Sequence, residues 1–169
     1  MDVFSHGLWG GVAFGRKNRR SFITACVFGV APDLLSFGVL FLLMVFGFTA
    51  LPDFSLEPPD PASIPQYVHA LYNITHSLIV FMGIFGLLWL YVKRPVWESL
   101  AWMLHILVDI PTHSYDFFPT PFLWPASGFM VDGVPWSSPW IFIPNVILLA
   151  GAYLWFFVIR SRLSRLQKK

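Results

Sequence analysis

Lysine and arginine are confined to three short clusters in this chain of 169 residues, and neither occurs within 21–92 or 95–159. Hydrophobic residues make up 56% of the chain and charged residues 12%, against about 45–50% and about 25% in an ordinary soluble domain. Such a chain cannot build a water-facing surface, which excludes a soluble enzyme, a nucleic-acid-binding protein and a disulfide scaffold. The clusters are Arg16, Lys17, Arg19 and Arg20, then Lys93 and Arg94, and finally Arg160, Arg162, Arg165, Lys168 and Lys169.

The clusters also predict an orientation in a membrane. Short loops rich in lysine and arginine stay in the cytoplasm, so all three should mark the inner side of a bacterial or archaeal inner (plasma) membrane. Acidic residues gather within 53–60 and 116–132, which should mark the outer side. We therefore expect a multi-pass protein with a cytoplasmic C-terminus and an N-terminus towards the outer side. Nucleic-acid binding by the clusters is disfavoured, because each is short and abuts an apolar run.

The apolar segments predict an all-α fold, a polytopic membrane helical bundle with about five membrane segments. A straight crossing needs about 20 residues, so the first segment is too short to span alone. The second is longer than one crossing, and Pro32 should kink or break it. A segment rich in proline and aromatic residues, 111–139, should form an irregular outer cap, and 1–160 should form one domain before a basic cytoplasmic tail at 161–169. The membrane segments are 3–15, 21–50, 65–92, 95–110 and 140–159.

Five ionisable residues interrupt these apolar segments, and their cost in a membrane makes each a candidate for function. Counted from the nearest basic cluster at 1.5 Å per residue, all five lie in a layer about 15–25 Å above the inner surface. Ligands of one site must share a depth, whereas scattered structural residues need not. The sequence therefore predicts a His/Asp metal site facing the outer half of the bilayer. The candidates are His6, Asp33, His76, His105 and Asp109.

The sharpest pair, His105 and Asp109, has the i, i+4 spacing that places both side chains on one helical face. The two could chelate one metal, or one could orient the other; a buried His–Asp hydrogen bond that only joins helices is the alternative. Asp33 follows Pro32 at an expected helix break, which is a common design for ion sites in membranes. The alternative for Asp33 is a cap on the next helix.

The other two histidines are weaker candidates when each is taken alone. Thr75 could cap a helix and leave His76 incidental, and His6 could be a structural histidine. The shared depth is what joins them to the site. Further polar residues near this layer could orient the ligands or contact a substrate; they are His69, Tyr72, Ser77, Thr112 and His113.

The order and spacing of these motifs resemble the membrane-bound metal-dependent hydrolases known as LexA-binding, inner-membrane-associated hydrolases. The likeness covers most of residues 3–125, and the family is distantly similar to zinc-dependent phospholipase C. It implies metal-dependent hydrolysis of a phosphoester, with all five candidates as metal ligands. This chain departs from the usual pattern at Leu35, where many members have a second Asp, and at Leu71-Tyr72-Asn73, where many have His-Arg-Gly. The motifs are His6, Pro32-Asp33, Thr75-His76-Ser77 and His105-x-x-x-Asp109-x-x-Thr112-His113.

The resulting hypothesis is a membrane-embedded hydrolase with a divalent metal, one ion or two. Zinc is expected because imidazole and carboxylate suit it, with manganese or iron as alternatives. Metal-activated water would attack a phosphoester, lipid or lipid-linked, and Asp33 or Asp109 would accept its proton. The bilayer and that substrate are the expected partners, without nucleic acid, and the oligomeric state is left open. The alternatives are a non-catalytic metal- or proton-handling transporter, a haem protein using two histidines, and a structural anchor.

Overall fold

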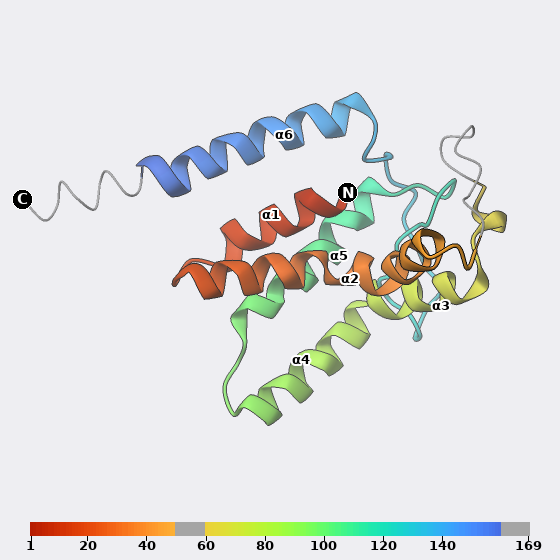
Figure 1. The fold of residues 1–169 in the computed structure, drawn as a ribbon, viewed down its shortest axis with the longest axis horizontal. Helices are drawn as coiled ribbons and strands as arrows, with labels where there is room; N and C mark the ends of the chain where they lie inside the picture. Colours follow the sequence, from red (N-terminus) through yellow and green to blue (C-terminus); the bar gives the residue numbers. More distant parts are fainter. Residues whose placement is uncertain (50–59, 160–169) are drawn as a thin grey trace, which may run out of the picture.

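The computed structural model describes residues 1–49 and 60–159 (Figure 1). Part of the expected acidic loop and the whole basic tail at 161–169 lie outside the described residues. Within them every regular element is a helix, which confirms the all-α class. The main helices are α1 (Val3–Phe14), α2 (Arg19–Val45), α3 (Gln66–Thr75), α4 (Leu78–Val92), α5 (Leu100–Thr112) and α6 (Pro139–Tyr153). The short ones are η1 (Pro61–Ser63), η2 (Trp97–Ser99) and η3 (Leu154–Ile159), the last a π-helical continuation of α6.

Two helices are long and apolar enough to cross a membrane. They are α2, with 27 residues, and the 20-residue run Pro139–Val158 that begins with α6; each has a mean hydropathy of 2.1. A third crossing is present if α3 and α4, which meet at 62°, count as one broken span. This is fewer than the five or so membrane segments expected from the sequence. The difference comes from α1 and α5, whose 12 and 13 residues fall short of the roughly 20 that a crossing needs.

Close backbone contact joins α1 to α2, and glycine makes it possible. A Cβ built on Gly29 would lie 2.5 Å from the carbonyl oxygen of His6, and one built on Gly10 would lie 2.8 Å from that of Ala25. Small residues that line a helix face in this way let two backbones approach in a membrane protein. The contact fixes α1 against α2 and α5, and His6 of α1 is buried.

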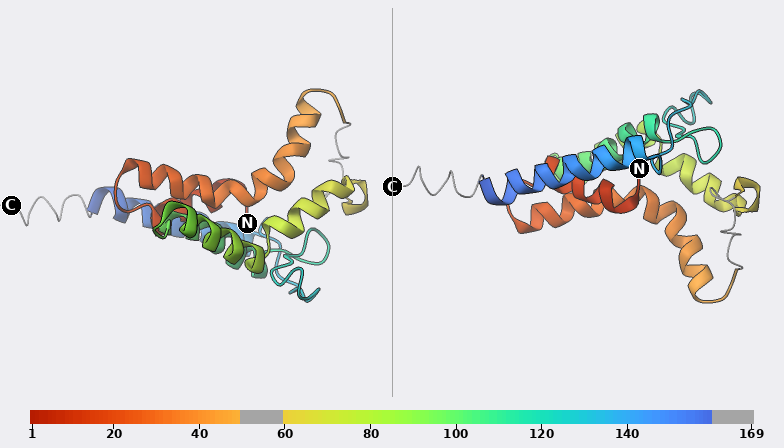
Figure 2. Two further views of the ribbon diagram at one scale, coloured as in Figure 1. Left: turned by 90° about the horizontal axis from the view of Figure 1, so that it is seen from below. Right: turned by 90° about the horizontal axis from the view of Figure 1, so that it is seen from above.

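Two breaks in regular helix shape the centre of the molecule. The first is at Pro32, where α2 continues as one helix but bends near its middle (Figure 2), so the expected kink is observed rather than a full break. The second separates α3 from α4. Ser77, and not Thr75, is the N-cap there, and its Oγ accepts a hydrogen bond of 3.2 Å from Val80 N. The carbonyl of Thr75 at this break accepts a 2.7 Å hydrogen bond from Trp102 Nε1.

An irregular segment between α5 and α6 covers one end of the bundle, as the prolines within 111–139 predict. Hydrogen bonds pin it to the elements beneath it. Gly133 N donates to His113 O (2.8 Å), and Leu78 N donates to Phe122 O (3.0 Å). The loops that join α1 to α2 and α4 to α5 lie on the opposite side of the molecule, at the left in Figure 1, which is also the side on which η3 ends. The two described basic clusters therefore share one end of the molecule.

Glu98 ties these two loops together. Its Oε1 accepts a 2.7 Å hydrogen bond from Ser21 Oγ and lies 3.6 Å from Lys17 Nζ. Burial on its own would raise the pKa of Glu98, but the Ser21 hydrogen bond and the Lys17 ammonium help to hold this pKa below its usual value.

Because the folded pKa of Glu98 is depressed, its stabilisation is present above the unfolded value of about 4.3 and is lost as pH falls through the folded pKa. We expect Glu98→Gln to lower the melting temperature in detergent at neutral pH, by an amount that shrinks below about pH 4.3. Ser21→Ala should reproduce part of the loss. A difference between Glu98→Gln and wild type that stays constant from acidic to neutral pH would contradict this role.

Candidate metal centre

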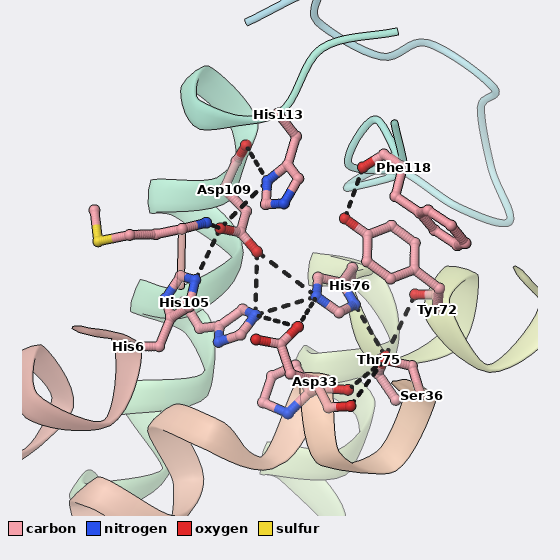
Figure 3. A network of polar contacts seen from close by, with 12 residues as sticks. His6, Asp33, Ser36, Tyr72, Thr75, His76, His105, Asp109, His113 and Phe118 are labelled. Carbon is pink, nitrogen blue, oxygen red and sulfur yellow. Dashed lines mark hydrogen bonds and ion pairs between the residues drawn. The ribbon is translucent and has the colours of Figure 1, made fainter. Parts of the chain in front are cut away.

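Three parts of the fold bring four of the predicted residues to one point (Figure 3). Asp33 comes from the bend of α2, His76 from the break between α3 and α4, and His105 and Asp109 from one face of α5. One ligand atom from each lies within 4.8 Å of all the others, so the group could hold a metal ion. The side chain of Asp33 is 13% exposed, and the other three side chains are exposed by 1% or less.

The separations between these four atoms suit a small cation. Donors at the corners of a tetrahedron around zinc, with bonds of about 2.0–2.1 Å, are about 3.3–3.4 Å apart. Five of the six separations fall close to this value. They are His105 Nε2–His76 Nε2 3.1 Å, His105 Nε2–Asp109 Oδ2 3.1 Å, His76 Nε2–Asp33 Oδ1 3.4 Å, His76 Nε2–Asp109 Oδ2 3.6 Å and His105 Nε2–Asp33 Oδ1 3.7 Å.

The outer nitrogen of each cluster imidazole is held by an oxygen. His105 Nδ1 lies 2.7 Å from the carbonyl oxygen of Gly29, which can only accept, so this nitrogen carries the proton. His76 Nδ1 lies 3.0 Å from Thr75 Oγ1, whose own proton is directed at the carbonyl of Tyr72 (3.4 Å). When His76 Nδ1 likewise carries the proton and donates it to Thr75 Oγ1, both neutral rings present the lone pair of Nε2 to the centre. Two lone pairs that face each other across 3.1 Å call for a positive ion between them.

His6 lies at the edge of this group rather than within it. Its ring stacks on that of His105, with centroids 3.6 Å apart, and its Nε2 is 2.9 Å from Asp109 Oδ1, whereas His76 and His105 face Oδ2. His6 Nε2 and Asp109 Oδ2 are both buried, with no hydrogen bond of normal geometry from the part of the chain that the structure describes. The resemblance implies that His6 is one of five metal ligands, although taken alone it is a weaker candidate; the structure places it where it can orient His105 and Asp109.

The outer oxygen of Asp109 has further neighbours. His113 Nδ1 lies 3.4 Å from Oδ1, and the backbone nitrogen of Met1 contacts the same atom. Pro111 is accommodated in the last turn of α5, so His113 turns back towards Asp109. The hydroxyl of Thr112 instead donates to Val108 O at 2.9 Å, within its own helix.

The remaining predicted residues separate into one that supports the centre and two that do not touch it. Tyr72 stacks on His76, with centroids 3.8 Å apart, and its hydroxyl donates to Phe118 O at 2.9 Å, which fixes the imidazole plane. Ser77 is occupied as the cap of α4. His69 lies apart, with its ring on Phe118 and its Nε2 3.2 Å from Pro61 O.

The supporting contacts of the centre include residues that sequence reasoning did not assign to it. Gly29 acts through its carbonyl on His105, and Thr75 through its hydroxyl on His76. The sequence does mark Gly29 as a packing residue, because Gly7-x-x-x-Gly11 and Ala25-x-x-x-Gly29 have the spacing of closely packed membrane helices. Thr75 belongs to the Thr75-His76-Ser77 motif, but from the sequence its suggested role is a helix cap.

The chemistry of the four donors fits a divalent metal. Two imidazole nitrogens with two carboxylate oxygens suit zinc, and manganese or iron can use the same donor types. The same geometry leaves no room for a haem between His76 and His105, since their nitrogens are closer than two carbon atoms in van der Waals contact. No family model, no curated protein and no solved structure matches this chain.

Proposed function

We propose that this protein is a membrane-embedded, metal-dependent hydrolase of a lipid or lipid-linked phosphoester, related to the family that its motifs resemble. The observation that carries the proposal is the pair of histidine Nε2 atoms 3.1 Å apart, faced by two carboxylates in an almost fully buried site. Neither an isolated His–Asp hydrogen bond nor a helix cap needs four converging donors. The metal, with zinc as the first expectation, is part of the proposal.

The placement of the centre in the membrane is also proposed. The basic loops would lie at the inner face and the irregular cap at the outer face, as the distribution of lysine and arginine favours. The short helices α1 and α5 would then complete a bundle of about five segments, packed beside the spanning helices without crossing alone. A centre at this depth is reached more readily by a substrate held in the bilayer than by one in water.

The residues divide the chemical roles between them. His76, His105 and Asp109 would hold the ion, with His6 and Tyr72 orienting them, and Asp33 would lie beside the coordination position left open for water. A bound divalent metal supplies Lewis acidity, which polarises a phosphoryl oxygen and makes water a stronger nucleophile at neutral pH. The protein supplies fixed donors and a buried site, so that little reorganisation is needed during the reaction.

Asp33 is the residue suited to accept the proton of the attacking water. Both oxygens of Asp109 already face histidines, at distances of 2.9 to 3.6 Å. The side chain of Asp33 is 13% exposed, against 1% for Asp109, and Asp33 directly follows Pro32 in α2. Its carboxylate therefore has the freer access to a water molecule.

Replacement of Asp33 by asparagine tests this role. Asparagine keeps an oxygen donor but cannot take up the proton, so we expect hydrolysis to fall roughly 10²- to 10⁴-fold. Metal content, measured by elemental analysis on the same purified protein, should stay close to that of wild type. Unchanged hydrolysis in Asp33→Asn would assign the base to another residue.

The function itself is tested with a panel of phospholipids, lipid-linked phosphates and soluble phosphodiesters. Purified protein in detergent micelles is assayed before chelation, after chelation and after zinc or manganese is added back. We expect hydrolysis of a lipid phosphoester that disappears with chelator and returns with metal. Hydrolysis that survives complete metal removal would overturn the metal-dependent mechanism.

A further inference from the structure

A pocket of about 400 Å³ lies between α1, α5 and α6. Its volume is within the range of roughly 300–1,000 Å³ that is common for small-molecule sites. The walls are largely apolar side chains. They include Trp9 from α1, Leu104 and Val108 from α5, and Ile141 and Leu148 from α6.

Asn145 also lines the pocket, but its side-chain amide does not make the pocket polar. Asn145 Oδ1 accepts a 2.8 Å hydrogen bond from Trp9 Nε1, and Asn145 Nδ2 donates one of 2.8 Å to Ser5 Oγ. The amide is therefore engaged at both ends in holding α6 to α1. What remains for an occupant is apolar contact, which favours a hydrocarbon.

The mouth of the pocket opens along a candidate membrane span. Ile147, on the outer face of α6, is 64% exposed, and Trp140 at its start is 86% exposed. Apolar side chains exposed to this extent on a membrane-crossing helix face lipid tails. Leu148 lines the pocket and is still 61% exposed, so the cavity is continuous with that lipid-facing side.

The inner wall of the pocket adjoins the candidate metal centre. Leu104 and Val108 each directly precede a cluster residue, His105 and Asp109, on α5. Met1 also lines the pocket, and its backbone nitrogen contacts Asp109 Oδ1. A chain that lies in the pocket would therefore have its polar end next to Asp109, one of the four residues of the centre.

From these contacts we infer that the pocket holds an acyl chain of a bilayer phospholipid and places the phosphoester of that lipid at the centre. The headgroup chemistry rests on the proposed function. Binding of the acyl chain depends on α1, α5 and α6 alone and needs no metal. The lipid pocket and the proposed hydrolase function can therefore be tested separately.

The test uses the full chain in vesicles of phosphatidylethanolamine and phosphatidylglycerol that contain a phosphatidylcholine with a photoactivatable group in its acyl chain. After illumination, labelled residues are mapped by mass spectrometry. We expect wild-type labelling to concentrate on 104–108 of α5. Leu148→Trp, which fills the pocket, should reduce that labelling roughly fivefold or more, because overfilling a packed site is costly. Ile147→Trp, the same change on the outer face of α6, should leave it unchanged.

Labelling of 104–108 that is equal in Leu148→Trp and Ile147→Trp, or no concentration of label on these residues in wild type, would overturn the inference. Ile141→Trp serves as a second pocket-filling variant if Leu148→Trp does not fold. Metal content is measured on every sample. Wild-type protein that takes up no added zinc or manganese but labels at 104–108 would refute the proposed function and keep the lipid pocket. Protein that binds metal but lacks this labelling would refute the pocket and leave the proposed function standing.

Discussion

Purified His105→Ala protein is expected to carry less than roughly a tenth of the metal found in wild type. Loss of even an outer partner of a ligand commonly costs 10- to 100-fold in metal affinity, and His105 contributes a donor atom that faces the other three. The measurement is elemental analysis after dialysis against a known concentration of free zinc or manganese. Asp109→Ala should lose metal to at least the same degree, since Oδ2 lies 3.1 Å from His105 Nε2 and 3.6 Å from His76 Nε2.

His69→Ala is the matched control for this experiment. It removes the same side chain at a position outside the cluster, where the ring stacks on Phe118. Its metal content should equal that of wild type. Full metal content in both His105→Ala and Asp109→Ala would remove the site described here. A wild-type protein that takes up no metal would show that a proton, and not a metal ion, lies between the facing histidines.

The second large effect is expected from Gly29→Ala, which adds a single methyl group to α2. In a helix interior Gly→Ala normally stabilises by up to about 1 kcal/mol. At Gly29 the sign should reverse, because the added Cβ would meet the His6 carbonyl oxygen at 2.5 Å and Gly7 Cα at 3.2 Å. We expect Gly29→Ala to lower the free energy of unfolding by about 1–3 kcal/mol, the usual cost of overpacking. The readout is thermal or denaturant unfolding in detergent.

Gly29→Ala should also weaken metal binding, since the displaced backbone carries both His6 and the carbonyl that holds His105. Gly38→Ala is the control on the same helix. Its Cβ would meet only Leu34 side-chain atoms, at 3.7 and 3.8 Å, which is ordinary contact, so it should be neutral or slightly stabilising. Equal effects of the two substitutions on stability would show that α1 is free to move away from α2 without cost.

Some of the centre could be predicted because its geometry is local. The i, i+4 spacing places His105 and Asp109 on one face of any helix, and Pro32 disturbs a helix wherever it sits inside one. The number of membrane-crossing segments could not be predicted correctly from the sequence. A hydropathy run gives the length of an apolar stretch, whereas α1 and α5 are short helices that pack within the bundle.

By itself the sequence determined that the chain is helical and strongly apolar, and it predicted a similar height for five of its histidines and aspartates. Height along a helix follows from counting residues, because the rise per residue is constant. Only the tertiary structure decided which of those side chains meet. That depends on how each helix is rotated about its axis, and here the rotation is set by glycine contacts between α1 and α2, the bend at Pro32 and the break beside His76. For this reason His6, which was predicted at the same depth, lies against the outer oxygen of Asp109 and outside the group of four donors.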